Sequence, residues 1–358
     1  MNELSQLKSR GYNEFFEKSR LELKASIDCH ARVIAEHRGI YEIISLEGEG
    51  RATVAGKRMQ TASSRDDYPA VGDWVVIKDV PDAVKVIEHI LPRQTTLRKK
   101  YSGKDEAQLM VANVDMFFIV ESMDRDYNIN RFERYVILAR EGGVKPVIVL
   151  NKSDLLSEAD LVLRVQELNS RFSDIDILHT STVSDDGLDS IASYIRPSAT
   201  YCFLGSSGVG KSSIINKLID QTIETKTIGT KTGRGRHTTT ARQMYFTKDG
   251  GIIIDNPGSR EVGVVNFGNG ADEVFLDIKK ISRRCRYRNC NHINEQGCAV
   301  MDAIKSGDIE LSQYENYLKL QKETEHYEMS VYDKRKKDKK FGKFIKNAKS
   351  DLKKYKTQ

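Results

Sequence analysis

The chain of 358 residues contains no apolar run near the roughly 18 residues that a membrane-spanning helix requires. Its N-terminal stretch, Met1–Lys24, is charged throughout and lacks the apolar core of a secretory signal, so nothing marks it for export. Five cysteines are an odd number and do not suggest a disulfide framework. These absences predict a cytoplasmic protein with no membrane partner.

Positive charge is concentrated at the C-terminal end. Twelve Lys or Arg and three Asp lie between Asp333 and Gln358, a net charge of +9, whereas the whole chain carries +6. The remainder therefore carries about −3. Such a tail suits a polyanionic partner, through phosphate neutralisation and counterion release, and equally suits a disordered end that keeps the protein in solution.

The hydrophobic pattern divides the chain into several parts, as its length requires. Residues 1–27 form a charged, helical extension, and 28–100 hold short apolar runs separated by turns, which predict a small β-barrel. An OB-like barrel is the first interpretation, and a generic β-domain without a ligand is the alternative. Over 106–264, apolar strands alternate with helical stretches, the pattern of a mainly parallel α/β sheet. A cysteine-rich helical region over 267–330 and the basic tail over 331–358 follow.

Nine strands are expected from these runs. In the barrel they are Ala31–Ala35, Ile40–Ile44, Ala52–Val54, Trp74–Ile77 and Val84–Ile90. In the α/β sheet they are Met116–Val120, Pro146–Leu150, Tyr201–Leu204 and Gly251–Ile254.

A phosphate-binding motif lies between the strand ending at Leu204 and a helical stretch. The segment Gly205–Ser212 matches G-x-x-x-x-G-K-[ST], in the strand and helix context of a P-loop. Its glycines let successive backbone N–H groups converge on phosphates at a helix N-terminus. Lys211 would neutralise the β- and γ-phosphates, and the Ser212 hydroxyl would bind Mg²⁺. The sequence therefore predicts a nucleoside triphosphate site.

A second motif, Asn151–Asp154, follows another apolar strand and reads N-K-S-D. The Asp154 carboxylate can accept hydrogen bonds from N1–H and the 2-amino group of guanine, and adenine lacks this pair of donors. Asn151 and Lys152 would cover the base and brace the P-loop. Ser181 and Thr182, which follow a further short strand, are candidates for the backbone contact with guanine O6.

A third motif would sense the γ-phosphate. Asp255-Asn-Pro-Gly258 matches D-x-x-G, in which Asp255 would hold Mg²⁺ through water and the Gly258 N–H would face the γ-phosphate. The preceding loop, His237-Thr-Thr-Thr240, offers a second Mg²⁺ hydroxyl, and Thr239 is our choice among three adjacent candidates.

The catalytic group is less well defined by the sequence. Ser259 stands where many GTPases place a glutamine that orients the attacking water. We therefore expect slow intrinsic hydrolysis that a partner or His237 completes. His237 could instead contact RNA or shape its loop.

The order of these motifs is itself informative. GTPases usually run from the P-loop to N-K-x-D, whereas here N-K-x-D comes first. Because a folded domain does not depend on where its chain is cut, the order predicts a circularly permuted GTPase domain. It also places D-x-x-G directly before the C-terminal region, so movement of this switch could be transmitted there.

Three thiols and one imidazole lie close together in the C-terminal region, at Cys285, Cys290, His292 and Cys298. They form a full tetrahedral set for Zn²⁺ with no open position, which predicts a structural metal. The arginines around them suit an RNA-contacting surface; they are Arg283, Arg284, Arg286 and Arg288. Cys29 and Cys202 are expected to be buried thiols.

The permuted motif order, combined with the C-x₄-C-x-H-x₅-C spacing, resembles the ribosome small-subunit-dependent GTPase A (RsgA/YjeQ/YloQ) family. The similarity covers nearly the whole chain, including Tyr68–Trp74 in the barrel and Ala112–Asp115 at the junction. It implies an OB barrel, a permuted GTPase domain and a zinc-finger domain. It also implies that GTP is hydrolysed to GDP and phosphate with stimulation by the small ribosomal subunit (30S), during late maturation and in contact with its rRNA.

The implied cofactors are one structural Zn²⁺ per chain and Mg²⁺ with GTP, and we expect a monomer. The residues that the resemblance assigns to GTP are Asn151, Lys152, Ser153, Asp154, Gly205, Ser206, Ser207, Gly208, Val209, Gly210, Lys211, Ser212 and Ser213. The chain departs from the family at Asn256, Asn289 and Gln296, none of which is an expected ligand. Two alternatives stay open: a GTP-gated RNA-binding module in which hydrolysis only resets binding, and a GTPase whose barrel and zinc finger contact proteins.

Overall fold

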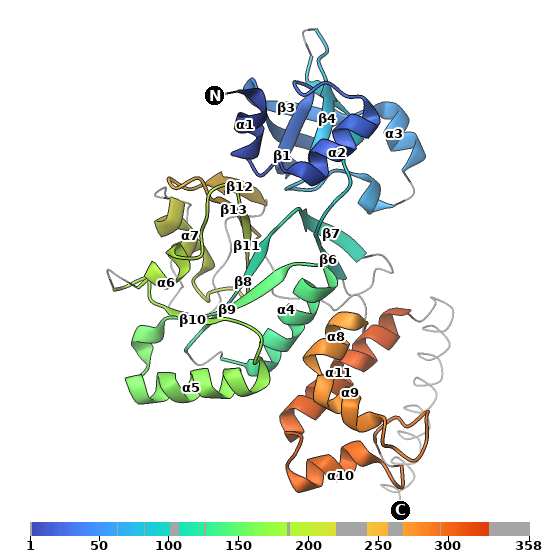
Figure 1. The fold of residues 1–358 in the computed structure, drawn as a ribbon, viewed down its shortest axis with the longest axis vertical. Coiled ribbons are helices and arrows are strands. Elements are labelled where there is room, and N and C mark those ends of the chain that lie inside the picture. Colours follow the sequence, from blue (N-terminus) through green and yellow to red (C-terminus); the bar gives the residue numbers. More distant parts are fainter. Residues whose placement is uncertain are drawn as a thin grey trace, which may run out of the picture.

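The computed structural model describes residues 2–62, 64–81, 83–100, 107–124, 127–184, 187–219, 242–256, 268–293 and 295–328. A barrel lies at one end of the molecule, an α/β sheet in the middle and a helical region at the other end (Figure 1). None of the helices in these ranges has the length and apolar character to cross a membrane.

The barrel is a closed ring of five strands in the order β1-β2-β3-β5-β4, closed by pairing of β4 with β1. Its strands are β1 (His30–His37), β2 (Ile40–Ser45), β3 (Gly48–Val54), β4 (Trp74–Lys78) and β5 (Lys85–Ile90). All five strands expected from the sequence are present. Apolar side chains such as Val33 and Ile43 alternate inward and fill the barrel. Helix α3 (Gly56–Thr61) follows β3.

Two N-terminal helices, α1 (Glu3–Lys8) and α2 (Glu14–Leu23), cover one side of the barrel. Each begins at an asparagine, Asn2 or Asn13, whose side chain accepts a backbone N–H of the first turn. Phe16 packs against Trp74 of β4, so this segment and the barrel share a small core.

The central sheet has the order β10-β9-β8-β11-β13-β12, parallel except for the antiparallel strand β12. Its strands are β8 (Met116–Ser122), β9 (Lys145–Asn151), β10 (Ile177–Thr180), β11 (Thr200–Leu204), β12 (Gln243–Phe246) and β13 (Ile252–Asp255). The four strands expected here are present. The parallel strands end at one edge, where ligands of such sheets bind.

Helices cover both faces of this sheet. One core includes α4 (Ile129–Glu141) and α5 (Glu158–Arg171), and the core of the opposite face includes α6 (Asp189–Ala192) and α7 (Lys211–Ile219). A separate hairpin of β6 (Thr96–Lys100) and β7 (Ala107–Ala112), which the sequence did not suggest, joins the barrel to β8.

The barrel and the central sheet are continuous, although the sequence pattern separates them. Barrel strand β1 pairs with β12 at Ala35 and Gln243, which creates one sheet of eleven strands. Arg32 of β1 is fully buried and donates hydrogen bonds to Thr200 Oγ1 (2.9 Å) and Asn113 O (3.1 Å). Burial lowers the pKa of Arg32 to about 10. The barrel is therefore fixed to the sheet by backbone and side-chain contacts.

The C-terminal region is helical and packs on α4 (Figure 1). It comprises α8 (Asn269–Val274), α9 (Leu276–Ser282), α10 (Ala299–Ser306) and α11 (Leu311–Glu328). Phe275 and Ile278 belong to the same buried core as Ile137 of α4. Arg134 of α4 forms two hydrogen bonds with the carboxylate of Glu323, at 2.6 and 2.7 Å. This region and the sheet domain therefore share one core.

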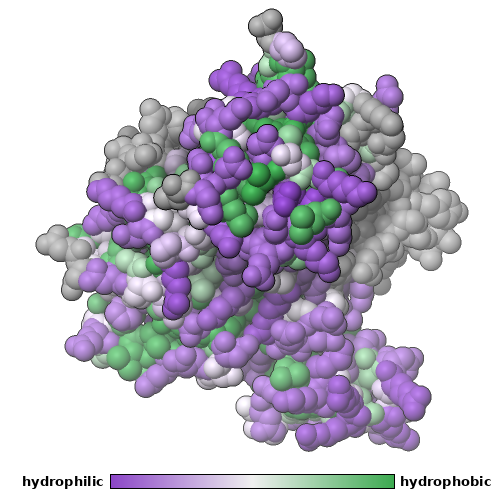
Figure 2. Space-filling model, turned by 45° about the horizontal axis from the view of Figure 1, so that its top comes forward, coloured by the Kyte–Doolittle hydropathy of each residue, from purple (hydrophilic) through white to green (hydrophobic). Residues whose placement is uncertain are grey.

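The face that carries the barrel forward is largely hydrophilic (Figure 2). Hydrophobic residues form small separate patches on the coloured part of this face, as is normal for a protein surface.

Candidate nucleotide site and Cys–His cluster

The P-loop runs from the end of β11 into α7, and two of its glycines lie where a side chain would clash. Gly205 has φ +146°, and a Cβ there would lie 2.1 Å from Val120 O of β8. Gly210 has φ +100°, and a Cβ there would lie 2.2 Å from Asn151 Nδ2. The loop therefore rests directly on the ends of β8 and β9, as a backbone cradle for phosphates requires.

Asn151 connects the P-loop to the N-K-x-D segment. Its side-chain Nδ2 donates to Val209 O at 2.7 Å, and its Oδ1 accepts from Thr180 Oγ1 at 3.1 Å. Asn151 is fully buried, so both hydrogen bonds are shielded from water. The bracing role expected of Asn151 is consistent with this geometry.

Asp154 lies beside the segment that follows β10. The Ser181 hydroxyl donates to Asp154 Oδ1 at 2.6 Å, and the Ser153 hydroxyl donates to Thr180 O at 3.0 Å. The structure thus brings the two predicted base-recognition segments together, and Thr182 follows Ser181 in the same loop. The carboxylate of Asp154 is exposed and oriented, as an acceptor for a guanine edge must be.

Lys152 pairs with a residue that the sequence motifs did not reveal. Its backbone is left-handed, with φ +61°, and its Nζ lies 2.8 Å from Asp124 Oδ2. Asp124 follows β8 closely, so β8 and β9 both contribute side chains to this side of the site. No motif marks Asp124, which lies in the connection after β8.

Lys211 is buried, and its side chain turns back onto the P-loop. Its Nζ donates to Gly205 O (2.8 Å) and Ser206 O (2.6 Å). Burial lowers the pKa of Lys211 to about 8, against the opposing attraction of Asp255 and Glu121. A bound phosphate would add negative charge beside the ammonium and favour its charged form.

Asp255 ends β13 next to the P-loop strand and is only 2% exposed. Its Oδ2 has no hydrogen-bond partner within the described ranges. Burial raises the pKa of the Asp255 carboxyl, and Lys211 partly opposes this. An unpaired buried carboxylate oxygen near a phosphate loop fits a hydrated Mg²⁺ well, because the cation would supply the missing partner.

Glu121 is a second acidic residue that the sequence analysis missed. It is fully buried at the end of β8, with Arg131 Nη1 3.2 Å from its Oε2 and Ser206 Oγ 3.4 Å from its Oε1. Burial raises its pKa to about 7, although Arg131 opposes this. A buried carboxylate under the P-loop could be recognised only from the folded arrangement.

Three of the expected site residues, His237, Thr239 and Gly258, lie outside the described residues. Ser212 and Ser213 occupy the first turn of α7, beside Lys211. The described part of the site therefore comprises the phosphate loop, the base-recognition segments and Asp255.

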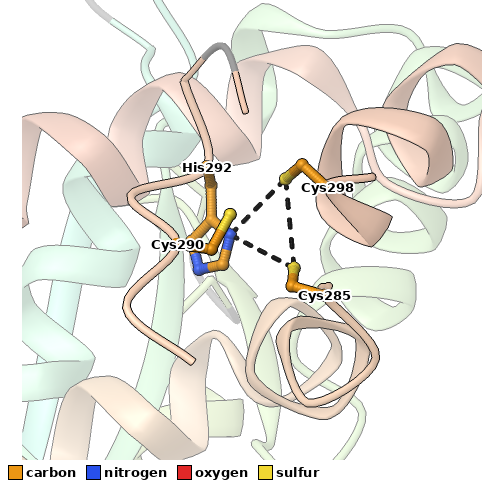
Figure 3. A group of neighbouring side chains, drawn as sticks. All are labelled: Cys285, Cys290, His292 and Cys298. Atoms are coloured by element: carbon orange, nitrogen blue, oxygen red, sulfur yellow. Dashed lines mark hydrogen bonds between the residues drawn. The ribbon is translucent and has the colours of Figure 1, made fainter. Parts of the chain in front are cut away.

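The four predicted metal ligands come together in the C-terminal region (Figure 3). Their ligand atoms all lie within 4.8 Å of one another. His292 Nδ1 lies 3.6 Å from both Cys285 Sγ and Cys298 Sγ, and these two sulfurs are 4.0 Å apart. Sulfurs at about 2.3 Å from a tetrahedral Zn²⁺ are roughly 3.8 Å apart. The Cys–His cluster, completed by Cys290, is therefore compatible with a zinc site.

The loop that carries the Cys–His cluster is held by further polar contacts. The Tyr314 hydroxyl of α11 donates to His292 O at 2.6 Å. The Glu295 carboxylate accepts the backbone N–H groups of Asn291 (3.1 Å) and Ile293 (3.2 Å). These contacts orient the ligands from outside, as surrounding groups do in metal sites. Of the other thiols, Cys202 is buried as expected, whereas Cys29 is half-buried.

Known proteins are similar to this chain over most of its length. The RsgA GTPase family matches residues 90–265, and the family described as 50S ribosome-binding GTPase matches residues 200–331. The small ribosomal subunit biogenesis GTPase RsgA 2 of Lactiplantibacillus plantarum is 37% identical, over 82% of this chain and 82% of its own. The protein of the same name from Vibrio parahaemolyticus is 36% identical, over 97% of this chain and 94% of its own.

Two solved structures are also similar. YjeQ from Thermotoga maritima has a TM-score of 0.57 and 27% identity, over 82% of this chain and 98% of that one. YloQ, described as a circularly permuted GTPase, has a TM-score of 0.55 and 21% identity, over 84% of this chain and 96% of that one, and it supports the fold alone. The predicted fold class is confirmed: the chain belongs to the RsgA GTPase family and is a GTP-hydrolysing enzyme with a circularly permuted GTPase domain.

Proposed function

We propose that this enzyme assists the late maturation of the small ribosomal subunit (30S) and hydrolyses GTP faster when it is bound to that subunit. The relatives that match most of the chain are named as small ribosomal subunit biogenesis GTPases. The observation that carries the nucleotide part is the convergence of Asp154, Lys211 and Asp255 at the carboxyl edge of one parallel sheet. We also propose a cytoplasmic location for it, in keeping with a role in ribosomal subunit biogenesis.

Each part of the site has a proposed task. Asp154, steadied by Ser181, would accept the guanine N1–H and 2-amino group, and the segments Asn151–Asp154 and Ser181–Thr182 would enclose the base. The backbone of Gly205–Ser213 would bind the phosphates, and Lys211 would neutralise the charge that grows on them during hydrolysis.

Mg²⁺ would be held by the Ser212 and Thr239 hydroxyls and, through water, by Asp255. When bound, it neutralises phosphate charge and helps to align the triphosphate. His237 and the Gly258 N–H would act at the γ-phosphate, and this proposal rests on sequence position alone.

The C-terminal region would supply an RNA-binding surface. A structural Zn²⁺ at the Cys–His cluster would fix the loop that carries the exposed arginines Arg283, Arg284, Arg286 and Arg288. Guanidinium groups suit phosphate contact, so rRNA is the expected ligand. The basic tail over 331–358 lies outside the described residues and would add charge to the same partner.

The decisive experiment compares GTP turnover with and without purified small ribosomal subunits. We expect turnover to rise at least tenfold with subunits, and Lys211→Ala to abolish it, which controls for contaminating GTPases. Unchanged turnover, with binding that still follows the GTP state, would favour the GTP-gated RNA-binding module. Subunit binding that is insensitive to salt would favour contacts with proteins instead of rRNA.

A further inference from the structure

One short strand connects the barrel to the D-x-x-G segment. Gln243 of β12 pairs with Ala35 of barrel strand β1 on one side and with Asp255 of β13 on the other. Asp255 is the carboxylate with the unpaired buried oxygen. Strand β12 alone therefore separates the barrel from the strand that carries this carboxylate, and this connection does not involve the P-loop.

Arg242, which directly precedes Gln243, makes a second connection in the same place. Its Nε donates to Asn256 Oδ1 at 3.1 Å, and its Nη2 lies 2.9 Å from Met110 Sδ of β7. Asn256 is fully buried, and its Nδ2 has no partner among the described residues. A guanidinium donor to a buried amide is a strong contact in such surroundings, so Arg242 restrains where Asn256 can lie.

The hairpin at the far end of this contact is fixed to the barrel. Val111 of β7 bridges to Val71, and the Ala112 N–H donates to Val71 O at 3.0 Å. Arg242 therefore spans from the barrel side of the molecule to the residue that follows Asp255. The adjacent residues Arg242 and Gln243 therefore contact the adjacent residues Asn256 and Asp255.

We propose that Arg242 is a positioning residue for GTP hydrolysis, which holds Asn256 and thereby sets the Asp255 carboxylate in place relative to the barrel. The proposal rests on the assignment of Asp255 to the Mg²⁺–GTP site made above. Arg242 would act through Asn256 and not by binding the nucleotide. Arg242 would affect the position of the Asp255 carboxylate, which is assigned to the Mg²⁺ of the triphosphate. Its loss should therefore lower kcat more than it lowers the affinity for GDP.

The test uses Arg242→Met in the full-length protein, because methionine keeps much of the side-chain length and removes the donors. We expect kcat to fall about tenfold, with GDP affinity within twofold of wild type. Asn256→Ala should give a similar fall, and the double variant should be no slower than either single one, because both remove the same contact. Arg242→Lys, which keeps a cationic donor, should recover part of the rate.

Arg140→Met is the matched control. Arg140 of α4 also forms ion pairs, with the exposed residues Asp174 and Glu273, but these lie outside the nucleotide site. We expect its kcat to match the wild type. A purely structural role for Arg242 would instead lower thermal stability, kcat and GDP affinity together, or would give additive losses with Asn256→Ala, and either result would overturn the proposal.

Asp255→Ala separates this proposal from the site assignment on which it rests. If Asp255→Ala keeps wild-type kcat, the assignment of Asp255 fails. If Asp255→Ala loses activity while Arg242→Met keeps it, the assignment holds and only the role of Arg242 is wrong.

Discussion

The Ser181 hydroxyl donates a 2.6 Å hydrogen bond to Asp154 Oδ1, across the ends of the neighbouring strands β9 and β10. Asp154 is exposed, so this contact is what holds its carboxylate in one orientation. Recognition of a base edge by a carboxylate depends on such orientation, because both guanine donors must meet it at once. The base choice of this enzyme should therefore be sensitive to both residues.

Replacement of Asp154 by Asn should change which base is bound. The amide offers an N–H towards a guanine edge that already presents two donors, whereas xanthine presents a carbonyl oxygen there. We expect Asp154→Asn to bind GTP about 100-fold more weakly and to prefer XTP. Competition titrations with the two nucleotides measure this. A variant that still prefers GTP would show that the base is recognised elsewhere.

Loss of the Ser181 hydroxyl should weaken binding without changing the preference. Ser181→Ala leaves the Asp154 carboxylate in place but frees its rotation, so we expect GDP affinity to fall about fivefold. Calorimetric titration measures it. Ser190→Ala is the control, because the Ser190 hydroxyl donates to His179 O on the surface, away from Asp154. Equal effects in both variants would contradict the orienting role of Ser181.

The Cys–His cluster should hold one zinc ion per chain. Elemental analysis should find about one Zn²⁺ in the wild type and much less in Cys290→Ser, because a structural site needs all four ligands. We expect this variant to unfold around the cluster and to keep its GTP affinity. Cys29→Ser, which removes a thiol outside the cluster, should keep its metal. Full zinc content in Cys290→Ser would reject the ligand set.

Glu133 should make stability depend on pH. Burial raises the pKa of this α4 carboxyl from 4.5 to about 7, although Arg171 and Asn316 favour its charged form; Glu310 is the other nearby acid. A raised carboxyl pKa means that the folded state binds the proton more tightly than the unfolded state. Stability should therefore fall as pH rises from about 4.5 to about 7, by roughly 3 kcal/mol, and then level off.

Glu133→Gln is permanently neutral and should remove this contribution. Thermal or urea unfolding at several pH values between 4.5 and 8 measures it, and the variant should lose less stability over that range than the wild type. Glu158→Gln, at an exposed position of α5, is the control and should follow the wild type. Parallel curves for wild type and Glu133→Gln would contradict the raised pKa.

The nine strands expected from the sequence were predictable because each is a local apolar run, whereas β12 (Gln243–Phe246) was not expected. The motif loops were predictable because their chemistry requires fixed residues at fixed spacing, as at Gly205–Ser212. The β6–β7 hairpin was not predictable, because Thr96–Lys100 reads T-L-R-K-K and lacks the alternation of a half-buried strand.

The contacts between distant segments could not be predicted from the sequence either. Strand β12 is only four residues long, and its pairing with β1 depends on how two domains meet. Glu121 and Asp124 carry no motif, and their place beside Ser206 and Lys152 follows from the order of the strands in the sheet. A local pattern cannot report such neighbours.

The shared core of α4 has a consequence for how the chain can be divided. Ile137 of α4 is buried together with Phe275 and Ile278, which belong to the region after the D-x-x-G segment. A shortened protein that ended before this region would leave that side of α4 open to water, and Arg134 would lose Glu323. The boundary suggested by the motifs near residue 267 therefore separates the nucleotide-binding motifs from the Cys–His cluster, but it does not separate two independent folding units.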